Sequence, residues 1–159
     1  MIKRITNPLE FKTAVNDIFE LFDLENSEMG HALLKHDKDH IIRAYADKSL
    51  LAWDFFVWVN ISEEGKYDGI IAFANHKNEK FGEEIFTEYI WLSKNSMSGF
   101  KLLSTAIKFA RKKEFKYIIM STAVKHPKSE KISRFYERMG FLKDSITYIA
   151  KLWTEELQR

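Results

Sequence analysis

The sequence predicts one α/β domain of the mixed α+β type, with a central, mostly antiparallel sheet flanked by helices. The chain has 159 residues, 45% of them hydrophobic, which suffices for a single buried core. Strand-like segments at 51–61, 67–75 and 84–92 follow one another across short turns, as in antiparallel strands. A helical segment then separates 84–92 from the β-prone 117–121. A crossover of this length predicts a parallel pair.

The N-terminal third is expected to be mainly helical after a short first strand at Ile2–Ile5. Asn7 or Thr6 can cap a helix that has Pro8 at its first position and Glu10 three residues after Asn7. Two more helical segments are expected, one from near Ser27 and one at about 39–46. Their boundaries are not defined by the pattern.

Apolar periodicity indicates the remaining elements. Segment 51–61 is apolar on both faces, which predicts a strand covered on both sides. Residues 102–110 and 132–139 carry apolar stripes at helical spacing, and Gly140 is placed to end the second helix. Residues 141–152 are expected to supply one or two closing strands.

Composition excludes several classes of function. The net charge of +2 argues against bulk nucleic-acid binding. The absence of cysteine excludes disulfides, zinc–thiolate sites and thiol nucleophiles, and fits a reducing compartment. The first residues lack the apolar core of a signal peptide, and Asp54 interrupts the longest apolar stretch. The expectation is a cytoplasmic protein with no membrane segment.

A metal site is not predicted. His31, His36 and His40 lie near Asp37 and Asp39, but only His36 and His40 have the spacing that would place them on one helical face. The aspartates lack the glycine and the terminal glutamate of a calcium loop.

Residues 84–103 combine a strand, a polar turn and the start of an amphipathic helix. This arrangement directs backbone N–H groups and a helix N-terminus at one place, which suits a phosphate or pyrophosphate. An ordinary strand–helix turn without a ligand has the same local pattern.

Two segments resemble the GNAT (GCN5-related N-acetyltransferase) superfamily. Residues 94–99 (KNSMSG) are similar to its acyl-CoA motif Q/R-x-x-G-x-G/A, and an apolar helix start follows at 100–103. Residues 129–141 (SEKISRFYERMGF) are similar to N-x-x-A-x-x-x-Y-x-x-x-G-F. The layout of EYIW at 88–91 and of Thr147–Tyr148 near the end looks like that of divergent phage-type members. The resemblance implies a single GNAT-like domain over 1–159, with a splayed pair of parallel strands.

Three positions depart from the family pattern. Lys94 stands in place of Gln or Arg, Met97 in place of the first Gly, and Ser129 in place of Asn. Met97 adds a Cβ where the family places backbone close to phosphate, so reduced coenzyme affinity or a different path of the loop is expected.

The resemblance implies a site for acetyl-CoA. The main chain of Ile90–Leu92 would bond to the pantetheine arm, and the N–H groups of residues 94–100 would face the pyrophosphate. The residues expected to bind coenzyme A are Ile90, Trp91, Leu92, Lys94, Asn95, Ser96, Met97, Ser98, Gly99, Phe100 and Ser129.

Two side chains are candidates for proton transfer. Tyr136 could protonate the leaving thiolate, and its alternative role is that of a half-buried aromatic. Glu84, Phe86, Glu88 and Ile90 are expected to share one face of their strand. Glu88 is the preferred general base for the attacking amine because it lies nearest the expected acyl site. Glu84 is the fallback, a charge-paired structural role for Glu88 is equally compatible, and catalysis by proximity alone stays open.

The prediction is an N-acetyltransferase that transfers acetyl from acetyl-CoA directly to an amine in a ternary complex. The acceptor, a small molecule or a protein, is not defined, and a homodimer stays open. The main alternative is a catalytically degenerate GNAT-fold protein that binds a macromolecular partner. Nucleic-acid binding is a minor alternative, because no aromatic residues interleave the basic positions.

Overall fold

The computed structural model describes residues 1–24, 37–48, 54–78, 82–122 and 128–143. The chain divides into two compact units, the first made of residues 1–23 and 37–121 and the second of residues 24–36 and 122–159. The single domain over 1–159 stays a prediction.

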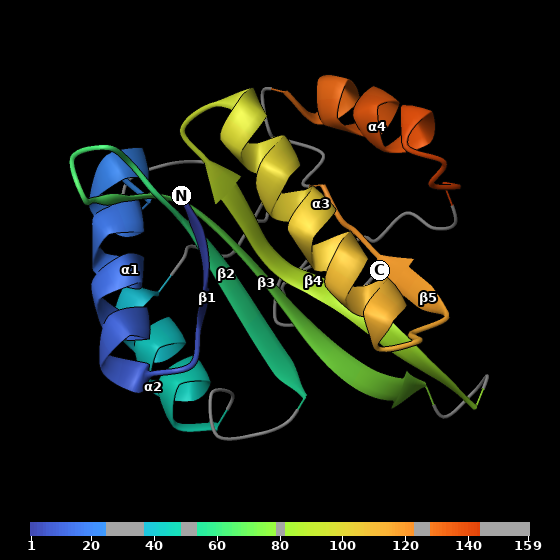
Figure 1. Cartoon of the computed structure of the whole chain (residues 1–159), viewed down its shortest axis with the longest axis horizontal. Helices are drawn as coiled ribbons and strands as arrows, with labels where there is room; N and C mark the ends of the chain where they lie inside the picture. Colours follow the sequence, from blue (N-terminus) through green and yellow to red (C-terminus); the bar gives the residue numbers. More distant parts are fainter. Residues whose placement is uncertain (25–36, 49–53, 79–81, 123–127, 144–159) are drawn as a thin grey trace, which may run out of the picture. The chain divides into compact units, whose positions relative to one another are not determined.

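The first unit is built on a five-stranded mixed sheet with strand order β1-β2-β3-β4-β5 (Figure 1). The strands are β1 (Ile2–Ile5), β2 (Phe55–Ile61), β3 (Tyr67–Asn78), β4 (Glu83–Ser93) and β5 (Tyr117–Ile119). The first four are antiparallel neighbours, and β5 lies parallel to β4. The predicted antiparallel succession and the parallel pair are therefore confirmed.

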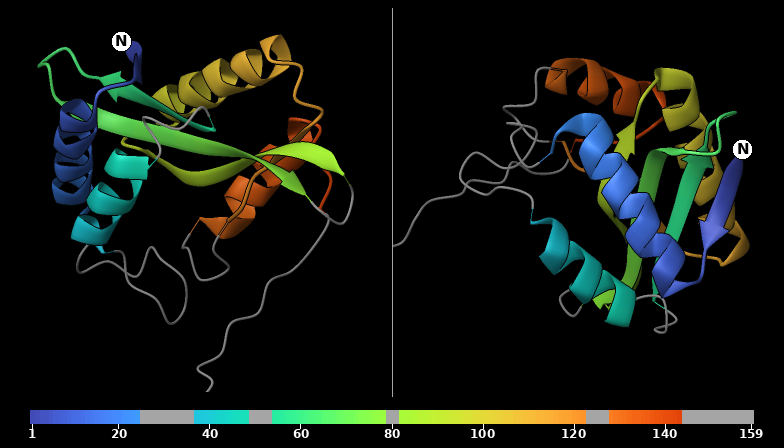
Figure 2. Two further views of the ribbon diagram at one scale, coloured as in Figure 1. Left: turned by 90° about the horizontal axis from the view of Figure 1, so that it is seen from below. Right: turned by 90° about the vertical axis from the view of Figure 1, so that its left-hand side faces the viewer.

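Helices cover both faces of this sheet. The helices of the first unit are α1 (Pro8–Phe22), α2 (Lys38–Lys48) and α3 (Ser96–Lys112). Helices α1 and α2 lie on one side of the sheet and α3 lies on the other (Figure 2). Asn7 caps α1 as predicted, since its side chain accepts a hydrogen bond of 2.8 Å from the Leu9 N–H. The segment expected from near Ser27 lies outside the described residues.

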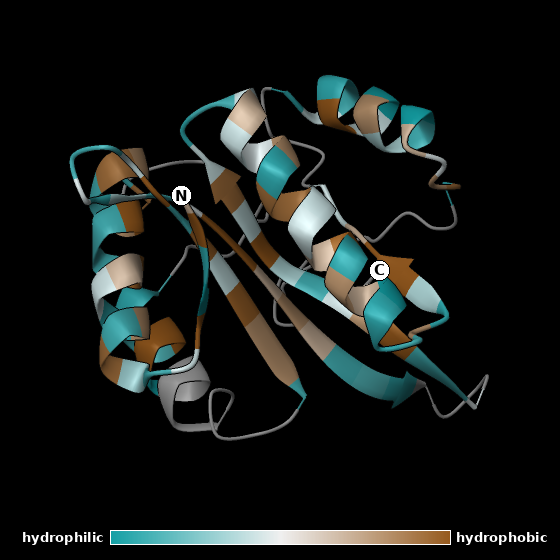
Figure 3. Cartoon of the chain, in the orientation of Figure 1, coloured by the Kyte–Doolittle hydropathy of each residue, from teal (hydrophilic) through white to brown (hydrophobic). Residues whose placement is uncertain are grey.

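Strand β2 is buried from Phe55 to Asn60, which confirms that both of its faces are covered. On the α3 side, aromatic rings fill the space between helix and sheet. Phe73 and Phe86 stack with ring centroids 4.2 Å apart, and Phe56 packs 4.7 Å from Phe109 of α3. Hydrophobic and hydrophilic residues alternate around α3, as an amphipathic helix requires (Figure 3). This cluster fixes the position of α3 on β4.

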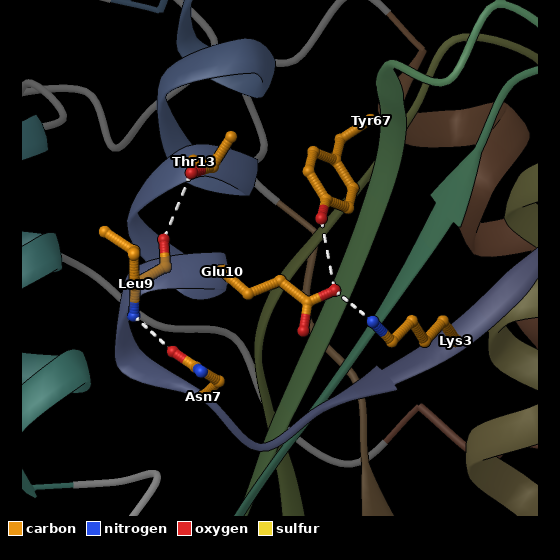
Figure 4. A network of polar contacts seen from close by, with 6 residues as sticks. All are labelled: Lys3, Asn7, Leu9, Glu10, Thr13 and Tyr67. Carbon is orange, nitrogen blue, oxygen red and sulfur yellow. Dashed lines mark hydrogen bonds and ion pairs between the residues drawn. The ribbon is translucent and has the colours of Figure 1, made fainter.

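Glu10 joins three elements of the first unit (Figure 4). Its Oε1 accepts from Lys3 Nζ of β1 at 2.6 Å and from the Tyr67 hydroxyl of β3 at 3.1 Å. The spacing to Asn7 predicts a capping role for Glu10, but β1 and β3 present these donors to its carboxylate instead. Burial, and then the hydrogen bond to Glu10, raise the pKa of Tyr67. The contacts tie α1 to the sheet.

None of the described helices has the length and apolar character needed to cross a membrane.

Candidate functional site

Strand β4 contains a bulge that changes which side chains face α3. Phe73 of β3 pairs with Glu88, but the preceding Ala72 pairs with Ile90, so Tyr89 is an extra residue on β4. Neighbouring residues of β3 point to opposite faces, and so do their partners. Glu84, Phe86 and Glu88 therefore share a face as predicted, but Ile90 lies on the opposite one.

After the bulge, the β4 side chains on the face covered by α3 are those of Trp91 and Ser93. Both side chains lie beside Gly99 of α3: a Cβ built on Gly99 would be 3.3 Å from Ser93 Cβ and 3.5 Å from Trp91 Cζ2. Gly99 thus allows close packing of helix on strand. The resemblance had associated this glycine with the phosphate loop.

Strands β4 and β5 separate at a fork, defined here as the point after the pairs that end with Thr87 and Ile119. No described residue of β5 pairs with β4 beyond Thr87, while β4 continues beside β3 as far as Ser93. The splayed parallel pair implied by the resemblance is therefore present. Ile90–Leu92, the expected partners of the pantetheine arm, lie on the segment past the fork.

The carboxylate of Glu88 lies at this fork. Its Oε2 accepts two hydrogen bonds from Ser121, one from the backbone N–H at 3.2 Å and one from the hydroxyl at 2.9 Å. Burial raises the pKa of Glu88, and the two bonds from Ser121 partly oppose the rise. A half-buried carboxyl with a raised pKa at the open end of a strand pair is a better proton acceptor than an exposed carboxyl.

Asn95 caps the start of α3 and reduces the number of backbone N–H groups that could bind a phosphate. Its side chain accepts from the Ser98 N–H at 2.9 Å, and its carbonyl accepts from the Gly99 N–H at 3.1 Å. The Lys94 N–H donates to the Asp68 carbonyl at 2.9 Å. These three amides are already bonded, so the donors available to an anion are the N–H groups of residues 95–97. Met97, among them, has a side chain that is 64% exposed.

Asn60 forms hydrogen bonds to the β2–β3 hairpin and to α3, and the sequence alone predicted no role for it. It lies on β2 and is only 8% exposed. Its Nδ2 donates to Asp68 Oδ1 at 2.5 Å and to Ser98 Oγ at 3.3 Å. A polar residue at the end of an otherwise apolar strand was the available signal. The network connects the β2–β3 hairpin to the first turn of α3.

A shallow polar cavity of about 360 Å³ lies beside this network. Side chains of both charges line it, Glu63 and Asp68 on the hairpin and Lys94 and Lys101 at the start of α3.

The second unit contains α4 (Ser129–Arg138), which confirms the helix expected from the apolar stripe. Ser129 begins the helix, and Gly140 follows its end with a φ of 89°. Tyr136 is buried, and its ring lies 6.1 Å from that of Phe135 and 5.5 Å from that of Phe141. Tyr136 and Glu88 belong to different units, so the proton-donor role of Tyr136 rests on the motif.

The described residues bring together no group of three or more His, Asp or Glu side chains that could hold a metal ion. His31 and His36 lie outside the described part of the chain.

The arrangement of the elements is shared with solved acetyltransferases. An aminoglycoside acetyltransferase from an uncultured soil metagenomic sample aligns with a TM-score of 0.68 at 12% identity, over 96% of this chain and 97% of that one. Another from such a sample, in complex with sisomicin, aligns with a TM-score of 0.68 at 14% identity, over 96% and 95%. Glucosamine-6-phosphate N-acetyltransferase from Arabidopsis thaliana gives 0.66 at 13%, over 96% and 97%.

The chain has the fold of the GNAT acetyltransferases. No family model and no curated protein matches the sequence. At these identities the likeness shows the GNAT fold. The fork, the bulge and the capped start of α3 are observed in this chain itself.

Proposed function

We propose that the protein is an N-acetyltransferase that transfers acetyl from acetyl-CoA to an amine. The observation that carries the proposal is the fork between β4 and β5, which opens directly before the start of α3 in a fold shared with acetyltransferases. Membership of a divergent phage-type group is part of the same proposal.

The coenzyme would lie along β4 past the fork. The main chain of Ile90–Leu92 would bond to the amides of the pantetheine arm, and the N–H groups of residues 95–97 would face the diphosphate. Lys94, Ser98, Gly99, Phe100 and Ser129 stay in the proposed binding set, the first three through side-chain or packing contacts because their amides are bonded within the chain.

The proposed reaction is direct attack in a ternary complex. The amine nitrogen forms a bond to the acetyl carbon, the carbon–sulfur bond breaks, and the coenzyme leaves as a thiolate. An amine with a pKa near 10.4 is mostly protonated at neutral pH, so its attack needs a proton acceptor. Glu88, or a water that it orients, would take that proton, and Tyr136 would protonate the thiolate.

Titration of the full chain with acetyl-CoA tests the proposal. Binding should raise the melting temperature, and the rise should continue with the logarithm of the acetyl-CoA concentration above the Kd. Adenosine alone, which lacks both the diphosphate and the pantetheine arm, is the control and should give no comparable rise. A folded sample whose melting temperature does not move at millimolar acetyl-CoA contradicts the proposal.

Tyr136→Phe is expected to lower kcat by about tenfold while leaving the Kd for acetyl-CoA unchanged. The effect is moderate because a thiol has a pKa near 8.5 and leaves readily as the thiolate. Steady-state kinetics and calorimetric titration measure the two quantities. Phe135→Leu on the same helix is the control for packing, and an unchanged kcat in Tyr136→Phe excludes Tyr136 as the acid.

The names of solved neighbours support an amine as the acceptor, since they include aminoglycoside, glucosamine-6-phosphate and ribosomal-protein-alanine acetyltransferases. We propose an amine-bearing acceptor, either a small molecule or a protein.

A second candidate is a GNAT-fold protein that binds a macromolecular partner without catalysis. Two observations favour it: the exposed Met97 in the cradle and the internal bonding of the Lys94, Ser98 and Gly99 amides. A stable stoichiometric complex with a purified partner that forms without coenzyme would support this candidate.

A further inference from the structure

We propose that Ser121 is a positioning residue that holds the Glu88 carboxylate at the fork, with one oxygen bonded to Ser121 and the other left for the reacting amine or its water. The catalytic part of this inference rests on the proposed function. The contact between the two residues stands independently of it.

The contact crosses the fork. The ladder between β4 and β5 ends one residue before Glu88, at the pair of Thr87 and Ile119. Ser121 follows β5, and its N–H, which can no longer bond to the β4 backbone, donates to Glu88 Oε2 at 3.2 Å. The side chain of Glu88 thus replaces the backbone acceptor that a continued ladder would supply.

The hydroxyl of Ser121 adds a second donor to the same oxygen, at 2.9 Å. Hydrogen bonds to an ionised group are shorter and stronger than neutral ones, and two donors on one oxygen fix the plane and rotamer of the carboxylate. Among the described residues, Ser121 is the only hydrogen-bond donor to Glu88. The second oxygen, Oε1, is therefore the one available to a substrate.

The charge of this carboxylate is set by few groups. Burial raises the pKa of Glu88, the two bonds from Ser121 lower it, and no charged side chain contributes to the shift. On the same face, β4 carries Glu84 and β3 carries Lys77, which pair with each other four ladder positions from Glu88. Strand β5 presents Ile118 on this face. The buried side of α3 is apolar, formed by Gly99, Leu102, Leu103, Ala106 and Ala110.

Ser121→Ala removes the hydroxyl and keeps the backbone donor, while Ser121→Thr restores a hydroxyl. The direct measurement is a pH titration of the side-chain carboxyl of Glu88 by carbon-13 NMR in the free protein, with Glu88→Gln identifying the signal. The midpoint should move to higher pH in Ser121→Ala and return in Ser121→Thr. Thr13→Ala, which removes a hydroxyl bonded to the Leu9 carbonyl at 3.1 Å, is the matched control and should leave the midpoint unchanged.

Kinetics tests the consequence for catalysis. The acidic limb of the kcat/KM profile should move in the same direction, so that Ser121→Ala keeps roughly a tenth of the wild-type value on the acidic side of the limb and nearly all of it on the plateau at higher pH. A purely structural role would lower the melting temperature without moving the limb.

The outcomes separate the two proposals. An unchanged Glu88 midpoint in Ser121→Ala overturns the positioning role, whatever the activity. A shifted midpoint in a protein that binds no acetyl-CoA supports the contact and overturns the proposed function. A shifted midpoint with a shifted limb supports both.

Discussion

Glu88→Gln is expected to lower kcat/KM for acetyl transfer by about 100-fold, because general base catalysis contributes at least that factor. Glutamine fills the same space at the fork, and its amide oxygen can still accept both hydrogen bonds from Ser121. It cannot take a proton from the amine. The Kd for acetyl-CoA should therefore stay the same while turnover falls.

The pH dependence of activity tests the same role of Glu88. Burial raises the pKa of Glu88, so the carboxyl keeps its proton to higher pH in the folded protein than in the unfolded chain. Activity should rise with pH as Glu88 ionises, and Glu88→Gln should lose this acidic limb.

The contribution of Glu88 to the free energy of unfolding falls as pH rises, whereas activity is expected to rise. A raised carboxyl pKa contributes stability that is fully present below the pKa of the unfolded chain and is lost as pH rises through the folded pKa. Glu88→Gln has no such loss, so the variant should not be less stable than the wild type at pH 8.

Glu84→Gln separates the two carboxylates of this face. Glu84 is exposed and lies four residues before Glu88, away from the fork. Its substitution is expected to change kcat/KM by less than about twofold. A larger loss in Glu84→Gln than in Glu88→Gln would transfer the base role to Glu84.

Phe86→Ala should lower the free energy of unfolding by about 3–5 kcal/mol. Phe86 is 0% exposed. Its ring centroid lies 4.2 Å from that of Phe73, on which it stacks, and 5.2 Å from that of Phe115. Its removal leaves a cavity between β4 and α3, directly before the fork. The loss is a large part of the stability of a small domain.

Urea unfolding followed by circular dichroism measures this loss. Leu9→Ala is the matched control, because Leu9 is 72% exposed and its truncation should cost less than about 0.5 kcal/mol. Phe86→Leu keeps part of the volume and should fall between the two. A loss below about 1 kcal/mol in Phe86→Ala would mean that the aromatic cluster does not hold α3 on the sheet.

Local signals allowed most elements of the first unit to be predicted from the sequence. The cap at Asn7 with Pro8 after it and the apolar stripe of α3 each act over a few residues. The same holds for Gly65, whose φ of 80° lets the chain turn between β2 and β3. The order of strands and the parallel pair then follow from the lengths of the connections.

The geometry of the site depends on partners distant in the chain. The alternation of Glu84, Phe86, Glu88 and Ile90 is regular in sequence, and only the pairing with β3 reveals the extra residue at Tyr89. Ser121 is separated from Glu88 by 33 residues. The cap at Asn95 does have a local signal, because asparagine is a common N-cap residue and stands three residues before Ser98.

At the bulge, the side chain of Tyr89 and its position in the chain have different effects. The side chain is 53% exposed, so many residues could stand there at little cost. The bulge sets the phase of the rest of β4: if Tyr89 were paired with Ala72 in a regular ladder, Ile90 and Leu92 would take the face that Trp91 and Ser93 occupy. A substitution at residue 89 therefore leaves this phase unchanged, and deletion of the residue would give a regular ladder in which Ile90–Ser93 keep their partners and faces.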